Sequence, residues 1–118
     1  MLFVRTFVAP SKIHGLGLFA DEAISKGTLV SKWTRGWDVC FSAEDLQKLP
    51  PLAKDFVEHF GWLADDVWHI SLDNSRYINH AIDHPNLEIA ETGGMKANRD
   101  IRKGEELLEN YETYCCAY

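Results

Sequence analysis

Two stretches of the sequence place polar side chains that can do chemistry directly after apolar, strand-like segments. Residues 76–86 read RYINHAIDHPN and carry Asn79 beside His80, followed by a Pro-Asn turn signal. Residues 104–111 read GEELLENY and end on Tyr111. An amide and an imidazole side by side at a tight turn form a corner that can hold a ligand. The alternative is that Asn79 and His80 only satisfy backbone groups of a loop, and that Tyr111 is a half-buried strand residue.

A glycine-containing turn near the start of the chain is a third candidate site. Residues 14–20 read HGLGLFA, and glycines two apart let a backbone turn sharply and approach a ligand without interference from a Cβ. The stretch is not the complete dinucleotide-binding fingerprint, because Ala20 stands at the third glycine position and no helical pattern follows. The alternative is a β-turn between two strands.

Short strands must position these three sites. Residues of high β-propensity between turn signals predict strands at residues 2–8, 28–33, 67–72, 87–90, 95–97 and 105–111. We find no internal repeat and no linker, and 118 residues suit one domain covering residues 1–118. The predicted class is therefore mainly β with frequent turns.

One helical insertion, at about residues 42–61, interrupts the strands. Ser42 with Asp45 three residues later resembles a capping box and predicts a helix over 43–49 that ends before the Pro-Pro pair. Pro51 can begin a second helix, whose apolar residues share one face until Gly61.

Composition and charge limit the classes of partner. The chain is 46% hydrophobic and 25% charged, as in globular proteins, and no apolar run approaches the roughly 20 residues that span a bilayer. Its start lacks the pattern of a secretory signal. The net charge of −6, without a basic stripe, argues against direct nucleic-acid binding and suits a basic protein or peptide partner. The alternative is that the charge only maintains solubility.

The cysteines and histidines do not form a recognisable metal or nucleophile motif. Cys40, Cys115 and Cys116 form no disulfide framework and no CxxC pair, so we expect free thiols in a reducing compartment, the cytoplasm, with a nucleus or host nucleus as the alternative. His80 and His84 lack a third ligand, so no metal is expected. No Ser or Cys lies in a G-x-S-x-G elbow, which argues against a hydrolase.

Taken in order, GLGLFA, RYINHAIDHPN and ANRDIRKGEELLENY resemble the motifs of the SET domain. This is the fold of most protein lysine methyltransferases that use S-adenosylmethionine. The resemblance covers about residues 3–111. It implies a β-clip-like fold of several small sheets with a short helical insertion, and a C-terminal segment that passes beside the Asn-His segment in a knot-like arrangement.

The resemblance also implies roles for individual residues. The family's tyrosine after Glu-Leu-x-x-(Asp or Asn) is catalytic, which corresponds here to Tyr111. Contacts with the cofactor, S-adenosylmethionine, are implied at Leu16, Gly17 and Leu18, mainly through their backbone, and at Asn79, His80 and Tyr111. The implied reaction transfers a methyl group to the side-chain amine of a lysine in a basic protein or peptide.

The chain also departs from the family's pattern. Ala81 and Ile82 stand where Ser and Cys are common, and no cysteine-rich segment follows. In many relatives that segment completes the lysine channel, and here only Tyr114 and Tyr118 of the short aromatic tail, residues 112–118, could do so. A homodimer that completes the substrate site is a further hypothesis. The alternative function is a SET-fold peptide-binding module with little or no catalysis.

Overall fold

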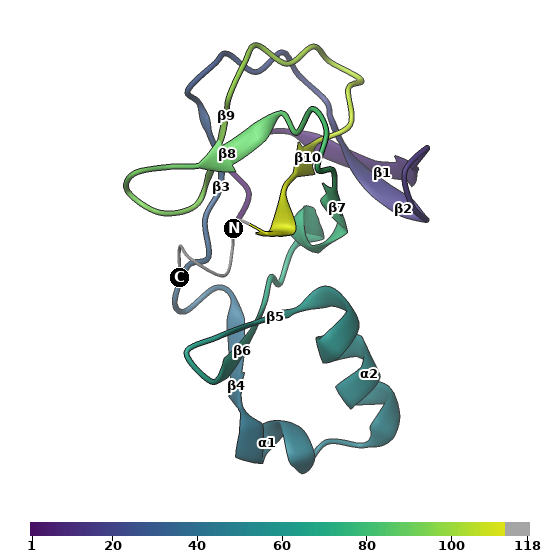
Figure 1. The fold of residues 1–118 in the computed structure, drawn as a ribbon, viewed down its shortest axis with the longest axis vertical. Coiled ribbons are helices and arrows are strands. Elements are labelled where there is room, and N and C mark those ends of the chain that lie inside the picture. Colours follow the sequence, from purple (N-terminus) through teal and green to yellow (C-terminus); the bar gives the residue numbers. More distant parts are fainter. Residues whose placement is uncertain (113–118) are drawn as a thin grey trace.

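The computed structural model describes residues 1–112 as two lobes built mainly from short strands. Figure 1 shows β1–β3 and β7–β10 in one lobe, and β4–β6 with both α-helices in the other. The elements are β1 (Thr6–Pro10), β2 (Leu16–Ala20), β3 (Leu29–Ser31), β4 (Val39–Ser42), α1 (Ala43–Gln47), α2 (Pro51–Phe60), β5 (Trp62–Ala64), β6 (Val67–Ile70), a 3₁₀ helix η1 (Asn74–Tyr77), β7 (Asn79–His80), β8 (Leu87–Ile89), β9 (Met95–Ala97) and β10 (Leu108–Glu109). Several small sheets with one helical insertion confirm the predicted fold class.

The N-terminal hairpin carries the glycine loop. Strands β1 and β2 pair antiparallel, and Pro10 opposite Leu16 is the last pair before the loop. Gly15 lies in this loop with a φ of +47°, a region that glycine enters at little cost. The strand predicted at residues 2–8 is therefore wrong in its limits. Proline can close a strand where its missing N–H is not needed for pairing.

The helical insertion is confirmed, although two strands around it were not predicted. Asp45 donates its backbone N–H to the Ser42 hydroxyl at 3.0 Å, which caps α1, and Pro51 begins α2. Strands β4, β6 and β5 form an antiparallel sheet in that order. The hairpin between β5 and β6 turns at Asp65 and Asp66, with φ values of +51° and +60°. Two successive positive φ angles define the tight turn of a two-residue hairpin. An Asp-Asp pair is a weaker sequence signal for this turn than Asn-Gly or Asp-Gly.

The end of the described chain lies against the Asn-His segment. Strand β10 pairs parallel with β7, with Leu108 opposite Asn79 and Glu109 opposite His80. The predicted strand at residues 105–111 is thus much shorter than expected. Residues before it bond to the N-terminal hairpin instead, and Leu107 donates its backbone N–H to the Leu18 carbonyl at 2.8 Å.

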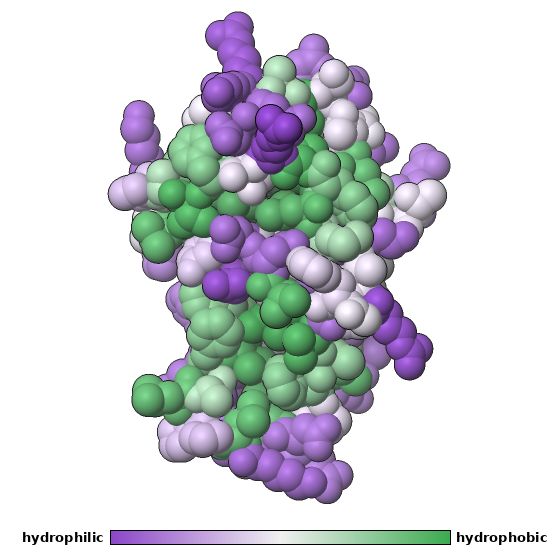
Figure 2. Space-filling view, turned by 180° about the vertical axis from the view of Figure 1, so that it is seen from behind, coloured by the Kyte–Doolittle hydropathy of each residue, from purple (hydrophilic) through white to green (hydrophobic). Residues whose placement is uncertain are grey.

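The core fills the lobe that holds β1–β3 and β7–β10. Its buried members are Leu18, Ala20, Ile24, Val30, Ile78, Leu87, Met95, Ala97, Ile101 and Leu107. Seen from behind, the surface shows apolar residues over both lobes and a band of hydrophilic residues between them (Figure 2). No helix in the described part of the chain is long and apolar enough to cross a membrane.

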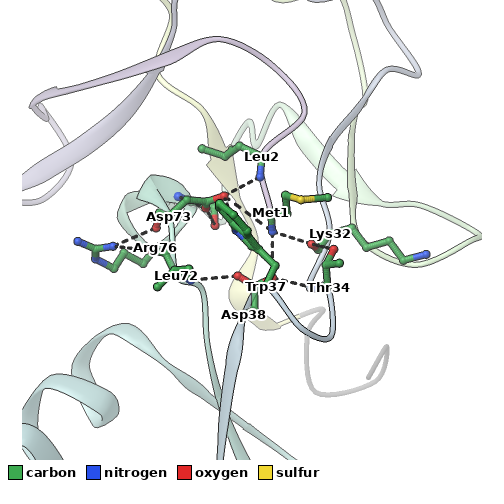
Figure 3. A network of polar contacts seen from close by, with 10 residues as sticks. Met1, Leu2, Lys32, Thr34, Trp37, Asp38, Leu72, Asp73 and Arg76 are labelled. Atoms are coloured by element: carbon green, nitrogen blue, oxygen red, sulfur yellow. Dashed lines mark hydrogen bonds and ion pairs between the residues drawn. The ribbon is translucent and has the colours of Figure 1, made fainter.

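Two carboxylates connect the lobes (Figure 3). The side chain of Asp38 is fully buried and accepts the N–H of Leu72 and the amino group of Met1, each at 3.0 Å. Asp73 accepts the N–H of Leu2 at 2.8 Å. Because Leu72 and Asp73 follow β6, these bonds fix the helical lobe to the N-terminal strand segment.

Candidate active site

Two neighbouring cavities share part of their walls. The loop cavity, of about 500 Å³, is lined by the glycine loop, by Asn79 and His80 and by residues of α2 and η1. The aromatic cavity, of about 370 Å³, is lined by residues of β3, α2 and β5 and by the end of the described chain. Four residues line both cavities: His59, Phe60, Arg76 and Tyr111. A group bound in one cavity therefore approaches a group bound in the other across these side chains.

Asn79 holds the glycine loop in place. Its Nδ2 donates to the carbonyl oxygens of His14 at 2.9 Å and Leu16 at 3.1 Å, and to Oε1 of Glu106 at 3.1 Å. The two bonds to backbone carbonyls join segments more than 60 residues apart in the sequence. The amide of Asn79 thus shapes the wall of the loop cavity.

Gly17 lies directly beneath the Glu106 carboxylate. A Cβ added at Gly17 would overlap Oε1 of Glu106 and lie 3.1 Å from the Cβ of Ser11. The glycine is needed because the same Oε1 accepts from Asn79. Gly17, Glu106 and Asn79 therefore form one packed unit behind the loop.

His80 and Tyr111 are joined directly. The backbone N–H of Tyr111 donates to Nδ1 of His80 at 2.9 Å, and the two ring centroids are 5.0 Å apart. The Tyr111 hydroxyl donates a hydrogen bond to the Ile78 carbonyl. Burial of the hydroxyl, and then the negative charge of Glu109, raise the pKa of Tyr111 to about 12. The phenol therefore stays protonated at neutral pH.

Arg76 contributes a cation to both cavities. Its guanidinium carbon lies 5.0 Å from the ring centre of Tyr77 and 5.8 Å from that of Phe60. Its Nη1 donates to the carbonyls of Leu72 and Asp73, each at 3.1 Å. The sequence motif includes this arginine, but only the structure shows that it faces both cavities.

The four glutamates near the end of the chain lie in different environments. Glu105 forms an ion pair of 3.1 Å with Arg99, Glu106 contacts the glycine loop, and Glu112 is exposed. Glu109 is only 5% exposed and lines the aromatic cavity. They do not form one acidic rim or one solvated strand face.

The structure brings most of the predicted site residues together. Leu16, Asn79, His80 and Tyr111 line the loop cavity. His14 and Gly15 of the candidate glycine turn also line it, as does Ile13, which lies outside the predicted motifs. Gly17 and Leu18 are both buried and do not line this cavity. The pairing of Pro10 with Leu16 explains the difference, because residues after Leu16 already belong to the sheet. Tyr114 and Tyr118 lie outside the described residues.

Within residues 1–112, no group of three or more His, Cys, Asp or Glu side chains is arranged to hold a metal ion.

The fold belongs to a recognised class. The model of the SET domain family matches residues 15–112, so the chain belongs to the SET domain family. The family match supports a methyltransferase. No curated protein sequence matches the chain.

Solved structures are similar over most of the chain. A candidate histone methyltransferase from Plasmodium falciparum is 20% identical with a TM-score of 0.63, and the match covers 92% of this chain and 93% of that one. A humanized mutant of Polycomb Repressive Complex 2 from Chaetomium thermophilum, bound to an inhibitor, is 27% identical with a TM-score of 0.66. That match covers 92% of this chain but 15% of the other, so this chain corresponds to a small part of that protein.

Proposed function

We propose that the protein transfers a methyl group from S-adenosylmethionine to the side-chain amine of a protein lysine. The observation that supports this most directly is the place of Tyr111 in the walls of both cavities. In this proposal the methyl donor occupies the loop cavity, and the lysine side chain enters the aromatic cavity. Tyr111 then lies where the two reactants meet.

The residues of the loop cavity fit the proposed donor. Its volume of about 500 Å³ falls within the usual range for small-molecule sites. Gly15 lines it, and a Cβ built there would meet no atom within 4 Å, so the space beside this backbone is open. Arg76 offers a cation for a carboxylate, and Phe60 and Tyr77 offer rings for an aromatic base. When bound, S-adenosylmethionine supplies a methyl group on a positively charged sulfur.

The aromatic cavity suits an amine that must lose its charge. Lysine's reference pKa near 10.4 lies about 3.4 units above neutrality, so deprotonation costs roughly 4.6 kcal/mol. Rings of Trp33, Phe60, Trp62 and Tyr111 line the cavity, and apolar surroundings disfavour an ammonium. The hydroxyl of Tyr111 orients the amine and can accept weak C–H contacts from the methyl group. Holding the reactants in line supplies much of the remaining acceleration.

The proposed substrate is a basic, lysine-bearing protein. The net charge of −6 favours encounter with basic partners. Histones are a suitable first test because a similar structure is described as a candidate histone methyltransferase. A homodimer is a separate proposal, and a monomeric mass by light scattering at assay concentration would exclude it.

One observation favours the alternative of a binding module without catalysis. The Asn79 amide and the Tyr111 hydroxyl both donate to backbone carbonyls, as scaffold residues do. Methyl incorporation separates the two functions, because both allow a basic peptide to bind.

The deciding experiment is transfer of a radiolabelled methyl group from S-adenosylmethionine to histone and ribosomal proteins. We expect incorporation at lysine, and Tyr111→Phe should lower it at least roughly tenfold, about 1.4 kcal/mol in the barrier. Circular dichroism and thermal melting at neutral pH control for folding of the variant. Peptide binding without incorporation would favour the binding module, and unchanged turnover in Tyr111→Phe would remove this tyrosine from the mechanism.

A further inference from the structure

Helix α2 exposes two neighbouring apolar side chains on one face. Leu52, Asp55, Phe56 and His59 follow the three- and four-residue spacing of a single helix face, and all four are exposed. Leu52 is 84% exposed and Phe56 is 45% exposed, whereas Val57 is the buried residue of this helix. Figure 1 shows α2 at one side of the helical lobe. We call the four exposed residues the α2 face, because adjacent apolar side chains rimmed by polar groups are typical of an interaction surface.

The α2 face is continuous with the two cavities. His59 lines both of them, and so does Phe60, whose ring centroid lies 4.8 Å from that of Phe56. Leu52 is seven residues before His59. The face therefore extends about 10 Å along the helix from the cavities, a distance that an extended peptide covers in about three residues. A segment that reaches into a cavity can also contact the α2 face.

The lobe that carries the α2 face is acidic. Residues 39–70 contain six acidic and two basic side chains, a net charge of −4 out of −6 for the whole chain. Both lysines are engaged, because Lys48 pairs with Glu44 at 3.5 Å and Lys54 Nζ donates to Oε1 of Gln47 at 3.4 Å. In the described part of the chain, five carboxylates of this lobe enter no ion pair: Asp45, Asp55, Glu58, Asp65 and Asp66. The lobe thus complements a basic partner.

Cations of the site lie at the cavity end of α2. The guanidinium carbon of Arg76 is 6.0 Å from the ring centre of Phe56, and two further cations, Lys32 and the amino group of Met1, line the aromatic cavity. Asp55 lines neither cavity. Basic side chains of a partner are therefore favoured along the part of the α2 face that lies away from the cavities.

We propose that the α2 face docks a basic segment of the substrate protein. A large apolar side chain of that segment packs on Leu52 and Phe56, and its cations lie beside Asp55 and Glu58. The proposal rests on the proposed function, because it assigns the segment to the protein whose lysine reacts. The preferred lysine then has, at least about three residues away, an apolar residue next to a basic one.

The charge of the lobe also argues against other occupants of the α2 face. A second copy of this chain would bring its own acidic lobe, and a nucleic acid or an anionic membrane would bring charge of the same sign. Like charges placed together across an interface are unfavourable and suppress such partners. A basic segment is therefore the occupant that the charges favour.

A lysine-free peptide tests the docking surface without any methyl transfer. The probe is an acetylated peptide of alternating arginine and leucine. It is compared with one that has neutral citrulline in place of arginine and one that has serine in place of leucine. The readout is the backbone amide NMR signals of α2 in the full chain. We expect the arginine–leucine peptide to shift these signals and to bind at least roughly tenfold more tightly than either of the others. Equal affinities, or shifts confined to other elements, would overturn the proposal.

Variants then locate the apolar contact. Leu52→Ser should weaken binding of the arginine–leucine peptide at least roughly fivefold, because it removes apolar surface that the complex buries. Ile82→Ser is the matched control, since Ile82 is also exposed and lines neither cavity, and it should bind as the wild type does. Both variants should fold, because substitutions of exposed side chains usually change stability little. Wild-type affinity in Leu52→Ser would overturn the proposal.

The contribution of charge is tested with two double variants. Asp55→Asn/Glu58→Gln removes two carboxylates from α2 and should weaken the arginine–leucine peptide at least roughly tenfold. Asp83→Asn/Glu91→Gln removes two exposed carboxylates outside the helical lobe and leaves the chain with the same net charge as the first double variant. It should bind as the wild type does. Equal weakening in both would show that the peptide responds only to net charge, and would overturn the docking site.

Methyl transfer gives an independent readout. The substrates are two peptides that carry a lysine beside the arginine–leucine segment, one of them with serine in place of leucine. We expect the wild type to have the lower KM for the leucine peptide, and Leu52→Ser to have similar KM values for both. The same preference in both proteins would overturn the role of α2 and leave the proposed function standing. Leu52-dependent binding of the lysine-free peptide without any transfer would support the docking surface and overturn the enzyme.

Light scattering at assay concentration tests the competing occupant, a second copy of this chain. We expect wild type, Leu52→Ser and Ile82→Ser to have the same mass. A dimer that Leu52→Ser dissociates and Ile82→Ser does not would assign the α2 face to the second copy and overturn the proposal.

Discussion

The backbone N–H of Tyr111 donates to Nδ1 of His80 across 2.9 Å. This bond holds the end of the described chain against the segment that carries Asn79 and His80. The parallel pairing of β7 with β10 brings the two residues together, and Ala81 adds a backbone bond to Glu109 at 2.9 Å. A residue that the family resemblance assigns to the cofactor thus also fixes the position of the tyrosine.

The first prediction concerns this bond. His80→Leu removes the acceptor and should cost about 0.5–1.5 kcal/mol in the free energy of unfolding. His80→Asn can place an amide oxygen near the position of Nδ1 and should lose less. Urea unfolding at neutral pH measures both variants. Equal losses in the two variants would show that the hydrogen bond is not what the histidine contributes to stability.

The second prediction concerns Gly17 and Glu106. Gly17→Ala should destabilise the protein by about 1–3 kcal/mol, because the new methyl group displaces a carboxylate bound to Asn79. Glu106→Ala removes that obstruction, so in the Gly17→Ala/Glu106→Ala double variant the alanine at position 17 should cost less. The contact with Ser11 Cβ at 3.1 Å remains and should leave a residual penalty.

A double-mutant cycle by urea unfolding measures this coupling, which we expect to be about 0.5–3 kcal/mol. Strictly additive effects would contradict the packed unit of Gly17, Glu106 and Asn79. Glu105→Ala is the matched control, because the neighbouring glutamate pairs with Arg99 and not with the loop.

Local signals explain which parts of the fold could be predicted from the sequence. Ser42 and Pro51 act within one helical turn of their own position, so both helices were predicted nearly to the residue. The limits of the first and last strands depend on partners far along the chain. The backbone N–H of Leu107, for example, donates to the carbonyl of Leu18 in the N-terminal hairpin and not to a residue near it in the sequence.

The site shows the same division. Motif order placed Asn79, His80 and Tyr111 in one group, but it could not reveal that Asn79 binds the carbonyl of His14. The burial of Glu109 had a usable signal. It lies two residues after Leu107, and alternate residues of a strand share a face. Because Leu107 is apolar and predicts the inward face of the strand, Glu109 on the same face could have been predicted to face inward as well.

The third prediction concerns Asn86, which sequence reasoning treated only as part of a turn. Its side chain is 2% exposed; Nδ2 donates to the Glu106 carbonyl and Oδ1 accepts from the Leu108 N–H, each at 2.8 Å. Asn86→Ala leaves both backbone groups without these partners and should cost about 2–4 kcal/mol. Asn98→Ala is the control, because it loses one side-chain bond, to Pro85 at 2.8 Å, and should cost about 1 kcal/mol. Similar losses by urea unfolding would contradict the role of Asn86 as a clamp on the final segment.

The last prediction follows from the pKa of Tyr111, which lies at about 12 in the folded chain against an ordinary value of 10.0. Between these values the unfolded chain releases the phenolic proton while the folded chain keeps it, so the folded state binds more protons. Stability must then fall as pH rises through this interval. Tyr111→Phe has no phenolic proton at this position, so it cannot lose stability in this way. We therefore expect the difference in free energy of unfolding between wild type and Tyr111→Phe to shrink above about pH 10. Urea unfolding from pH 8 upward measures this difference. In Glu109→Gln the decline should be weaker, because one of the two causes of the raised pKa is gone. An advantage that stays constant up to the highest pH at which the protein folds would show that the hydroxyl ionises equally in both states, and that neither burial nor the neighbouring carboxylate acts on it.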